Sequence, residues 1–421
     1  MTQEEMQTTL DAMGKKALSA SRALAVLDPG VKSAFLLRMA DMIEAEAADI
    51  IDANKADLEY GRGKGLSDAM LDRLRLDEKR IAAMAEGVRT VAAQSDPVGK
   101  VLEKRLRPNG LEITKVSVPF GVIGIIYESR PNVTVDAAAI CLKAGNAVML
   151  RGGSEAFNSN MKLADILDRA GVASGIPSGA VQLVPWRDRE AVKMMLKMDR
   201  VIDLIIPRGG EGLVRMVTAE ATMPVLKHYK GVCHLFVDEK CDIEKAVNII
   251  VNAKCQRPAT CNALETLLIS KAVLPEFAPH LAAAMRQNNV ELRGDEAFCR
   301  LIPDTAAASE DDYFAEYLNL TLAVKTVGSV EEAVNHINHY GSRHSDGIIS
   351  DIEEHIQYFF GNVDSSTLYA NASTRFTDGG EFGMGAEIGI STDKLHARGP
   401  MGVDELTTYK YLVRGNGQTR A

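Results

Sequence analysis

The chain has 421 residues, of which 46% are hydrophobic and 25% charged, and its formal net charge is −9. That length is too great for one core and predicts two or three domains of a soluble globular protein. The negative charge argues against nucleic acid as a partner, because a phosphate backbone needs a basic face. No apolar stretch reaches the roughly 18 residues of a membrane span, so we expect no membrane partner either.

Six cysteines are spread over the chain without a CxxC pair, and no histidines and cysteines recur at zinc-binding spacing. This usage predicts free thiols in a reducing compartment and no metal site. The first ten residues are acidic and polar, unlike a secretory signal. We therefore expect a cytoplasmic protein.

The first quarter of the chain, to about residue 105, has a helical pattern. Apolar residues such as Leu36, Ala40 and Ile43 recur there at three- and four-residue steps. Residues 107–119 instead predict extended chain, ending at Pro119. A hairpin of this kind before a βα series often projects from the body of a protein to pair with a partner subunit.

From Gly121 onward, short apolar runs alternate with helical segments. Strands are predicted at 122–127, 147–150, 181–184 and 201–206, and helices at 132–143, 158–170, 188–197 and 210–219. A second region of this kind starts near 231, with strands at 235–237, 267–269 and 322–327 and helices near 244–252, 272–286, 330–339 and 352–360. A last extended segment covers 407–413. The alternation predicts an α/β fold with doubly wound parallel sheets.

Two glycine-arginine turns follow predicted strands, at Arg151–Ser154 and at Pro207–Gly210. Helix N-termini after such strands bind anions, and glycine lets a ligand approach the backbone. The alternative is that both are ordinary tight turns. The dinucleotide fingerprint GxGxxG is absent, so a dinucleotide would bind by another route.

Cys261 lies in a polar turn, residues 254–263, that ends against the apolar run 264–269. A thiol in that position suits covalent acyl chemistry, although most buried cysteines are inert packing residues. Asn132 lies at a predicted helix start, where it is either an N-cap or an amide donor to an oxyanion. The polar segment 227–234, which holds His228, is either a solvated loop or part of a substrate pocket.

Five strings carry a resemblance to a known family: the segment from VPFGVIGIIYESRPNVTVDAAAI to MLRGGSEA, then IPRGGEGLVRMV, KCQRPATCNALETLL, AEYLNLTLAVKTV and FGMGAEIGISTDKLHARGPMGVDELTTYKYLV. In this order they resemble the aldehyde dehydrogenase superfamily and, within it, the gamma-glutamyl phosphate reductases. YESRPNVT, QRPATCNALE and KLHARGPMG are specific to that branch.

The resemblance implies an aldehyde dehydrogenase-like fold with two doubly wound domains and a small β element. Residues 1–106 and 120–230 would bind NADPH, 231–400 would form the catalytic domain, and 107–119 with 401–421 would form an oligomerisation element. It also implies reduction of L-glutamyl 5-phosphate to L-glutamate 5-semialdehyde, the second step of proline biosynthesis. A homo-oligomer and functional coupling to glutamate 5-kinase are further implied.

Site residues carry over one by one from the resemblance. Cys261 matches the nucleophile, whereas Cys255 does not, and Asn132 is the candidate oxyanion asparagine. The implied cofactor contacts are Arg151 near the adenine ribose, Gly209 and Gly210 over the pyrophosphate, and Glu316 on the nicotinamide ribose, with Ser154 as a further cofactor-binding residue. Charge and location suggest Arg257, Arg398 and Arg130 for the substrate's phosphate or carboxylate.

One departure from the superfamily bears on the reaction. Aldehyde oxidisers carry a glutamate that activates water to hydrolyse a thioester, but the matching stretch here, residues 230–234, has none. An enzyme that must reduce an acyl-enzyme would lose it to such a base. The sequence therefore favours acyl phosphate reduction through a Cys261 thioester. The alternatives are a CoA-dependent acylating dehydrogenase and a non-catalytic scaffold.

Overall fold

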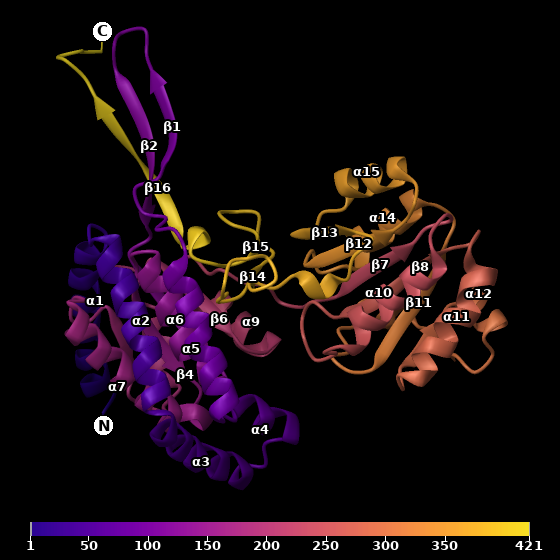
Figure 1. The fold of residues 1–421 in the computed structure, drawn as a ribbon, viewed down its shortest axis with the longest axis horizontal. Helices are drawn as coiled ribbons and strands as arrows, with labels where there is room; N and C mark the ends of the chain where they lie inside the picture. Colours follow the sequence, from indigo (N-terminus) through magenta and orange to yellow (C-terminus); the bar gives the residue numbers. More distant parts are fainter. Residues whose placement is uncertain (1, 421) are drawn as a thin grey trace. The chain divides into compact units, whose positions relative to one another are not determined.

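The computed structural model describes residues 2–420 and divides them into two compact units (Figure 1). Unit 1 comprises the chain up to Lys227 together with Gly383–Gly389 and the segment from Met401. Unit 2 comprises His228–Phe382 and Ile390–Pro400. The first boundary lies within three residues of the change predicted near 231.

Unit 1 begins with five helices, which confirm the helical pattern of the first quarter. Thr2 opens the first helix with a capping box, in which its hydroxyl accepts from the Glu5 N–H and the Glu5 carboxylate accepts from the Thr2 N–H. Asp28 caps the second helix, and Pro29 follows at its first position. The five are α1 (Gln3–Leu24), α2 (Pro29–Ala45), α3 (Ala47–Gly63), α4 (Asp68–Leu74) and α5 (Glu78–Ala93).

A four-stranded parallel sheet forms the centre of unit 1, in the order β5-β4-β3-β6. Its β3 is buried on both faces, as a continuous apolar run in a parallel sheet requires. The strands are β3 (Val122–Tyr127), β4 (Ala147–Gly152), β5 (Val181–Leu183) and β6 (Leu204–Arg208). The helices between and after them are α6 (Asn132–Lys143), the short η1 (Ser154–Ala156), α7 (Phe157–Ser174), α8 (Glu190–Met195) and α9 (Glu211–Glu220).

A second, antiparallel sheet of unit 1 has the strand order β1-β2-β16 and extends away from the helices (Figure 1). It joins β1 (Val101–Leu106), β2 (Glu112–Pro119) and β16 (Thr407–Arg414). The helical reading is therefore wrong for residues 101–105. Those residues become a strand because β2 pairs with them, a contact that the local pattern does not contain.

Unit 2 is built on a seven-stranded sheet in the order β10-β9-β11-β8-β7-β12-β13, with every neighbouring pair parallel. The predicted doubly wound fold is thus confirmed in both units. The strands are β7 (Cys233–Val237), β8 (Leu264–Ser270), β9 (Glu291–Gly294), β10 (Ala306–Ala307), β11 (Thr321–Val327), β12 (Ser345–Ile349) and β13 (Thr367–Ala370).

Helices cover both faces of this sheet and bury two separate apolar clusters. One cluster packs Leu267 and Val324 against Phe277, and the other packs Leu268 and Phe236 against Phe359. The helices are α10 (Ile243–Cys255), α11 (Leu274–Gln287), α12 (Glu296–Leu301), α13 (Glu310–Tyr313), α14 (Val330–Tyr340) and α15 (Glu353–Asn362), with the short η2 (Thr374–Phe376). The remaining elements are the two-stranded ladder of β14 (Ile390–Ser391) and β15 (Gly399–Pro400) and, in unit 1, η3 (Asp404–Leu406).

No helix between residues 2 and 420 combines the length and apolar character that crossing a membrane would require.

Candidate active site

Four polar groups of unit 2 come from loops that lead into neighbouring strands. β11, β8, β7 and β12 are adjacent and parallel, so their amino ends lie at one edge of the sheet. Glu316 precedes β11, Cys261 precedes β8, His228 precedes β7 and His344 precedes β12. The topology therefore gathers a thiol, two imidazoles and a carboxylate that are far apart in sequence.

The thiol of Cys261 lies beside the two histidines. His228, Cys261 and His344 each contribute one side-chain N or S atom, and these three atoms lie within 4.8 Å of one another. The two imidazole rings meet edge to face, with their centroids 5.5 Å apart. Burial by itself raises the pKa of the Cys261 thiol, but His344 and His228 outweigh it and hold that pKa well below its usual range. The two imidazoles therefore favour the thiolate form of Cys261, whose side chain is only partly buried, as a nucleophile must be.

The backbone of Cys261 packs directly on the segment that leads into β7. A Cβ added to Gly231 would stand 1.8 Å from the Cys261 carbonyl oxygen, so only glycine fits there. The thiol of Cys233 donates to the same carbonyl at 3.2 Å. This segment, 230–234, is where aldehyde oxidisers carry their glutamate. Here Gly231 has no side chain, and Cys233 is a buried thiol.

Arg375 of η2 binds the loop that carries Cys261. Its guanidinium donates to the side-chain oxygens of Gln256, at 2.8 Å, of Thr260, at 3.1 Å, and of Asn262. The Asn262 amide in turn donates to the Thr377 carbonyl at 2.9 Å. All three side-chain acceptors are neutral, so the guanidinium charge is not cancelled by these bonds. Burial and the nearby charge of Arg257 lower the pKa of Arg375.

The same loop is closed at its base by a buried ion pair. The ammonium of Lys254, at the end of α10, lies 2.6 Å from the carboxylate of Glu265, at the start of β8, and both side chains are fully buried. Lys254 also donates to the Leu264 carbonyl at 2.8 Å. Removing one partner of such a pair typically costs about 3–5 kcal/mol, because the other charge stays buried.

Glu316 lies at the same edge of the sheet. Its carboxylate accepts from the Gly231 N–H at 2.8 Å. Burial raises the pKa of the Glu316 carboxyl above its usual value, and the Gly231 N–H opposes that rise. The contact links Glu316 to the segment that packs on Cys261.

Among the predicted cofactor residues, Arg151 is buried at the end of β4. Its guanidinium donates to the backbone carbonyls of Gly152, Arg187 and Asp188 at 2.6–3.1 Å, and its Nε has no hydrogen-bond partner among residues 2–420. Ser154 opens η1, and its hydroxyl lies 3.5 Å from the Glu155 carboxylate. The three hydrogen bonds hold the Arg151 side chain against the backbone at Gly152, Arg187 and Asp188. Its Nε is the atom that a ligand could contact.

The turn before α9 already holds an anionic oxygen. The N–H of Gly210 donates to the Glu128 carboxylate at 3.0 Å, and a Cβ on Gly209 would stand 2.3 Å from that carboxylate. A backbone donor at a helix N-terminus that pairs with a carboxylate has the chemistry that a phosphate oxygen needs. The donors of this turn therefore fit a pyrophosphate, provided that Glu128 moves aside.

Asn132 is the first residue of α6, after Pro131 in the N-cap position. The interpretation of Asn132 as an N-cap is therefore wrong. Its amide instead donates to the Asp136 carboxylate at 2.8 Å. Burial raises the pKa of Asp136 to about 6, against that hydrogen bond and the charge of Arg208.

The three predicted substrate arginines lie in different surroundings. Arg130 is partly buried in the turn before α6, and Arg257 is exposed in the Cys261 loop. Arg398 pairs with Asp364, its Nη1 lying 2.9 Å from a carboxylate oxygen. Of these arginines, Arg257 belongs to the same loop as the thiolate.

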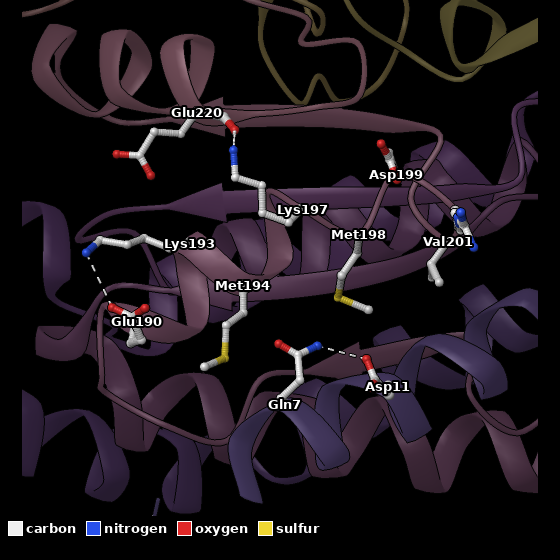
Figure 2. Close-up of a pocket in the computed structure, with 11 residues that line it drawn as sticks. Gln7, Asp11, Glu190, Lys193, Met194, Lys197, Met198, Asp199, Val201 and Glu220 are labelled. Atoms are coloured by element: carbon white, nitrogen blue, oxygen red, sulfur yellow. Dashed lines mark hydrogen bonds and ion pairs between the residues drawn. The ribbon is translucent and has the colours of Figure 1, made fainter. Parts of the chain in front are cut away.

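A pocket of about 560 Å³ opens in unit 1, and none of the predicted site residues lines it (Figure 2). Several of its polar groups bind one another: Lys193 pairs with Glu190 at 3.3 Å, and the Gln7 amide donates to Asp11 at 2.9 Å. The pocket holds neither the Cys261 thiol nor any predicted cofactor residue.

Comparisons with known proteins agree with this geometry. Residues 2–306 match the aldehyde dehydrogenase family. A gamma-glutamyl phosphate reductase of Caldanaerobacter subterraneus is 52% identical over 98% of this chain and 99% of its own, and that of Geotalea daltonii is 54% identical over 96% and 97%. The crystal structure of the Thermotoga maritima gamma-glutamyl phosphate reductase superposes with a TM-score of 0.95 at 43% identity, covering 98% of this chain and 100% of that one.

The chain therefore belongs to the aldehyde dehydrogenase family. Its nucleophile candidate, Cys261, lies in the loop that the resemblance predicted. Within the family, identity of about half over nearly the full length makes it one of the gamma-glutamyl phosphate reductases. The predicted resemblance and fold class are confirmed.

Two residues of the cluster escaped the sequence analysis. His344 was not considered, because the strand that it precedes, β12, has only two large apolar residues and gives no apolar run. Arg375 lies in a short 3-10 helix with no motif. His228 was noted only as part of a polar segment. The pairing of β12 with β7 is what brings His344 close to His228, and the sequence alone does not reveal this pairing.

Proposed function

We propose that the protein reduces L-glutamyl 5-phosphate to L-glutamate 5-semialdehyde and phosphate, with NADPH as the reductant. The observation that carries the proposal is the Cys261 sulfur beside the imidazoles of His228 and His344, in a chain whose relatives are named gamma-glutamyl phosphate reductase. Family membership supports a nicotinamide cofactor. We further propose that this cofactor is NADPH and not NADH.

In this mechanism the Cys261 sulfur attacks the C5 carbonyl of the acyl phosphate. The carbonyl oxygen becomes an oxyanion, and the Cys261 backbone N–H and the Asn132 amide are the proposed donors to it. The C–O bond to phosphate breaks, phosphate departs with the electron pair, and Cys261 is left as a thioester. The thiolate attacks without losing a proton, so no separate base is needed for this step.

Hydride reaches the thioester carbonyl in the second half of the reaction. When bound, the nicotinamide supplies that hydride. We assign Gly209, Gly210, Arg151 and Ser154 to the phosphates and adenine ribose of the cofactor, and Glu316 to its nicotinamide ribose. The C–S bond of the resulting hemithioacetal then breaks, which frees the aldehyde and regenerates the thiolate beside its histidines.

The bare backbone at Gly231 supports reduction over hydrolysis. Residues 230–234 contain no glutamate, and no side chain at position 231 fits against the Cys261 carbonyl, so this segment supplies no carboxylate base for water. The thioester can then persist until hydride arrives.

Positive charge near the thiol supports an anionic substrate. Arg375 is held by neutral oxygens and lies close enough to Arg257 for their charges to interact. We assign Arg257 and Arg375 to the departing phosphate, with Arg130 and Arg398 as the candidates for the substrate carboxylate. Because Arg398 is already paired with Asp364, it would have to share that carboxylate.

The deciding experiment runs the reaction in reverse. Glutamate semialdehyde, NADP and inorganic phosphate should give NADPH, with a strict phosphate requirement. Cys261→Ser should abolish this turnover and keep cofactor binding, whereas Cys255→Ser, six residues earlier, should keep both. A requirement for CoA in place of phosphate would instead indicate the CoA-dependent alternative, and no turnover with either would support a non-catalytic scaffold.

We further propose that the β1-β2-β16 sheet joins subunits into a homo-oligomer. Its edge strand β16 exposes 57% of Tyr411 and 58% of Val413, and β1 exposes 75% of Leu106. Replacing Tyr411 and Val413 together by lysine should produce a smaller species in analytical ultracentrifugation. Coupling to glutamate 5-kinase remains a prediction of the family resemblance, and a cytoplasmic location remains a prediction of the cysteine usage and the polar first residues.

A further inference from the structure

The cluster around Cys261 has the composition of a transition-metal site. His228, Cys261 and His344 each offer one ligand atom, and these atoms lie within 4.8 Å of one another. In a tetrahedral zinc site with bonds of about 2.0–2.3 Å, neighbouring ligand atoms are about 3.3–3.8 Å apart. Bringing the three atoms to that spacing requires side-chain shifts of about 1 Å, and His228 and Cys261 are only partly buried.

Existing hydrogen bonds orient both rings for a metal. The Nδ1 of His228 lies 2.8 Å from the Ile390 carbonyl oxygen, which can only accept, so Nδ1 carries a proton and Nε2 is the ring nitrogen that would bind a metal. The Nδ1 of His344 lies 2.8 Å from the Ser345 hydroxyl. Its Nε2 is buried and has no hydrogen-bond partner in the part of the chain that the structure describes. Metal-binding histidines are typically fixed in this way, by a bond from the ring nitrogen that does not touch the metal.

We propose that His228, Cys261 and His344 bind one Zn²⁺ ion, and that the bound ion inhibits the enzyme by occupying the Cys261 sulfur. One thiolate and two imidazoles are the ligands that zinc prefers, and they do not suit Mg²⁺ or Ca²⁺, which take oxygen. Three protein ligands leave a fourth position open to water. Binding of the ion does not depend on the function proposed above, whereas the inhibition rests on Cys261 being the nucleophile.

Titration of the full-length, chelator-treated protein tests the binding. Co²⁺ serves as the first probe, because thiolate coordination gives a ligand-to-metal charge-transfer band and tetrahedral geometry gives intense visible bands. We expect these bands to saturate at one equivalent and to disappear when Zn²⁺ displaces Co²⁺. Bound Zn²⁺ should protect Cys261 from iodoacetamide in peptide mass spectrometry, and a chelator should remove the protection.

Variants locate the site. Cys261→Ser should lose the charge-transfer band, and His228→Gln or His344→Gln should weaken Zn²⁺ binding at least about tenfold. Because His344 is fully buried, its variant can lose stability, and the partly exposed His228 keeps the test decisive. Cys255→Ser, at the last residue of α10 just before the loop, is the matched control and should bind normally. Equal affinity in Cys261→Ser or in His228→Gln would overturn the site.

Activity separates the two parts of the inference. In the phosphate-dependent assay, one equivalent of Zn²⁺ should inhibit the wild type, and His228→Gln should need at least about tenfold more. Zn²⁺ bound to Cys261 without inhibition would overturn the inhibitory role. If the protein has no reductase activity at all, the proposed function fails, but the cobalt spectra and the alkylation still decide whether the metal site exists.

Discussion

Replacing Gly231 by alanine should nearly abolish turnover. The added Cβ would stand 1.8 Å from the Cys261 carbonyl oxygen and 2.5 Å from the Cys261 Cα, whereas such atoms normally approach to about 3.5 Å. One of the two segments must therefore move by more than about 1 Å. Neither moves freely, because Glu316 holds the Gly231 N–H and Arg375 holds the Cys261 loop. A displacement of about 1 Å at a reacting group can cost about 10²-fold in rate, so kcat/KM should fall by at least that factor.

Three measurements show whether this reasoning holds. Steady-state kinetics give kcat/KM, the rate of iodoacetamide alkylation reports on the Cys261 thiolate, and cofactor binding shows that unit 1 is still folded. Gly87→Ala is the control, since nothing lies within 4 Å of its added Cβ in the middle of α5. That variant should keep full activity and gain about 0.4–1 kcal/mol of stability. If Gly231→Ala kept kcat/KM within about threefold of wild type, the packing of this backbone would not govern the nucleophile.

Three other predictions concern single charges. His344→Gln should slow alkylation of Cys261 at pH 7 by about tenfold or more and move the midpoint of its pH profile upward, because the charge of His344 is the largest influence that lowers the pKa of Cys261, and one pKa unit corresponds to about a tenfold change; an unchanged profile would contradict the role of His344. Glu128→Gln should tighten NADPH about two- to fivefold in a fluorescence titration by removing the carboxylate from the α9 N-terminus, while Glu220→Gln at the far end of α9 should not. Asp136 has a pKa raised to about 6, so burial favours its protonated form, and this contribution to stability is complete near pH 4 and lost as pH rises through 6. Relative to Asp136→Asn, the wild type should therefore lose up to about 3 kcal/mol of unfolding free energy between pH 4 and pH 7 in denaturant titrations, and parallel curves would refute the assignment.

The sequence predicted the secondary structure best where the local signal was strong. β3 and α6 have the predicted bounds, because the run at 122–127 is apolar throughout and the helix after it ends at a glycine with φ of +80°. The strand β12 was missed because the buried polar residues Ser345 and Asp346 interrupt its pattern, and β9 and β13 were missed because they have only four residues each. The burial of Ser345 and Asp346 depends on neighbouring strands, which no local window contains.

The sequence likewise predicted only part of the candidate site. Cys261 could be found from its turn and from the strings around it, but its histidines could not, since the order β8-β7-β12 is what brings His344 to the thiol. The rule that α/β sheets bind ligands at the carboxyl ends of their strands led to the cofactor turns of unit 1. In unit 2 the chemistry lies at the amino ends instead.

The buried pair of Lys254 and Glu265 gives the loop between them an unusual independence. The ion pair fixes both ends of the loop on rigid elements, so changes inside it need not disturb α10 or β8. Inside the loop, Gln256 and Thr260 accept hydrogen bonds from Arg375, whereas Arg257 is exposed. For protein engineering, variants at Arg257 should therefore retain folding and differ mainly in which acyl group reaches the thiol.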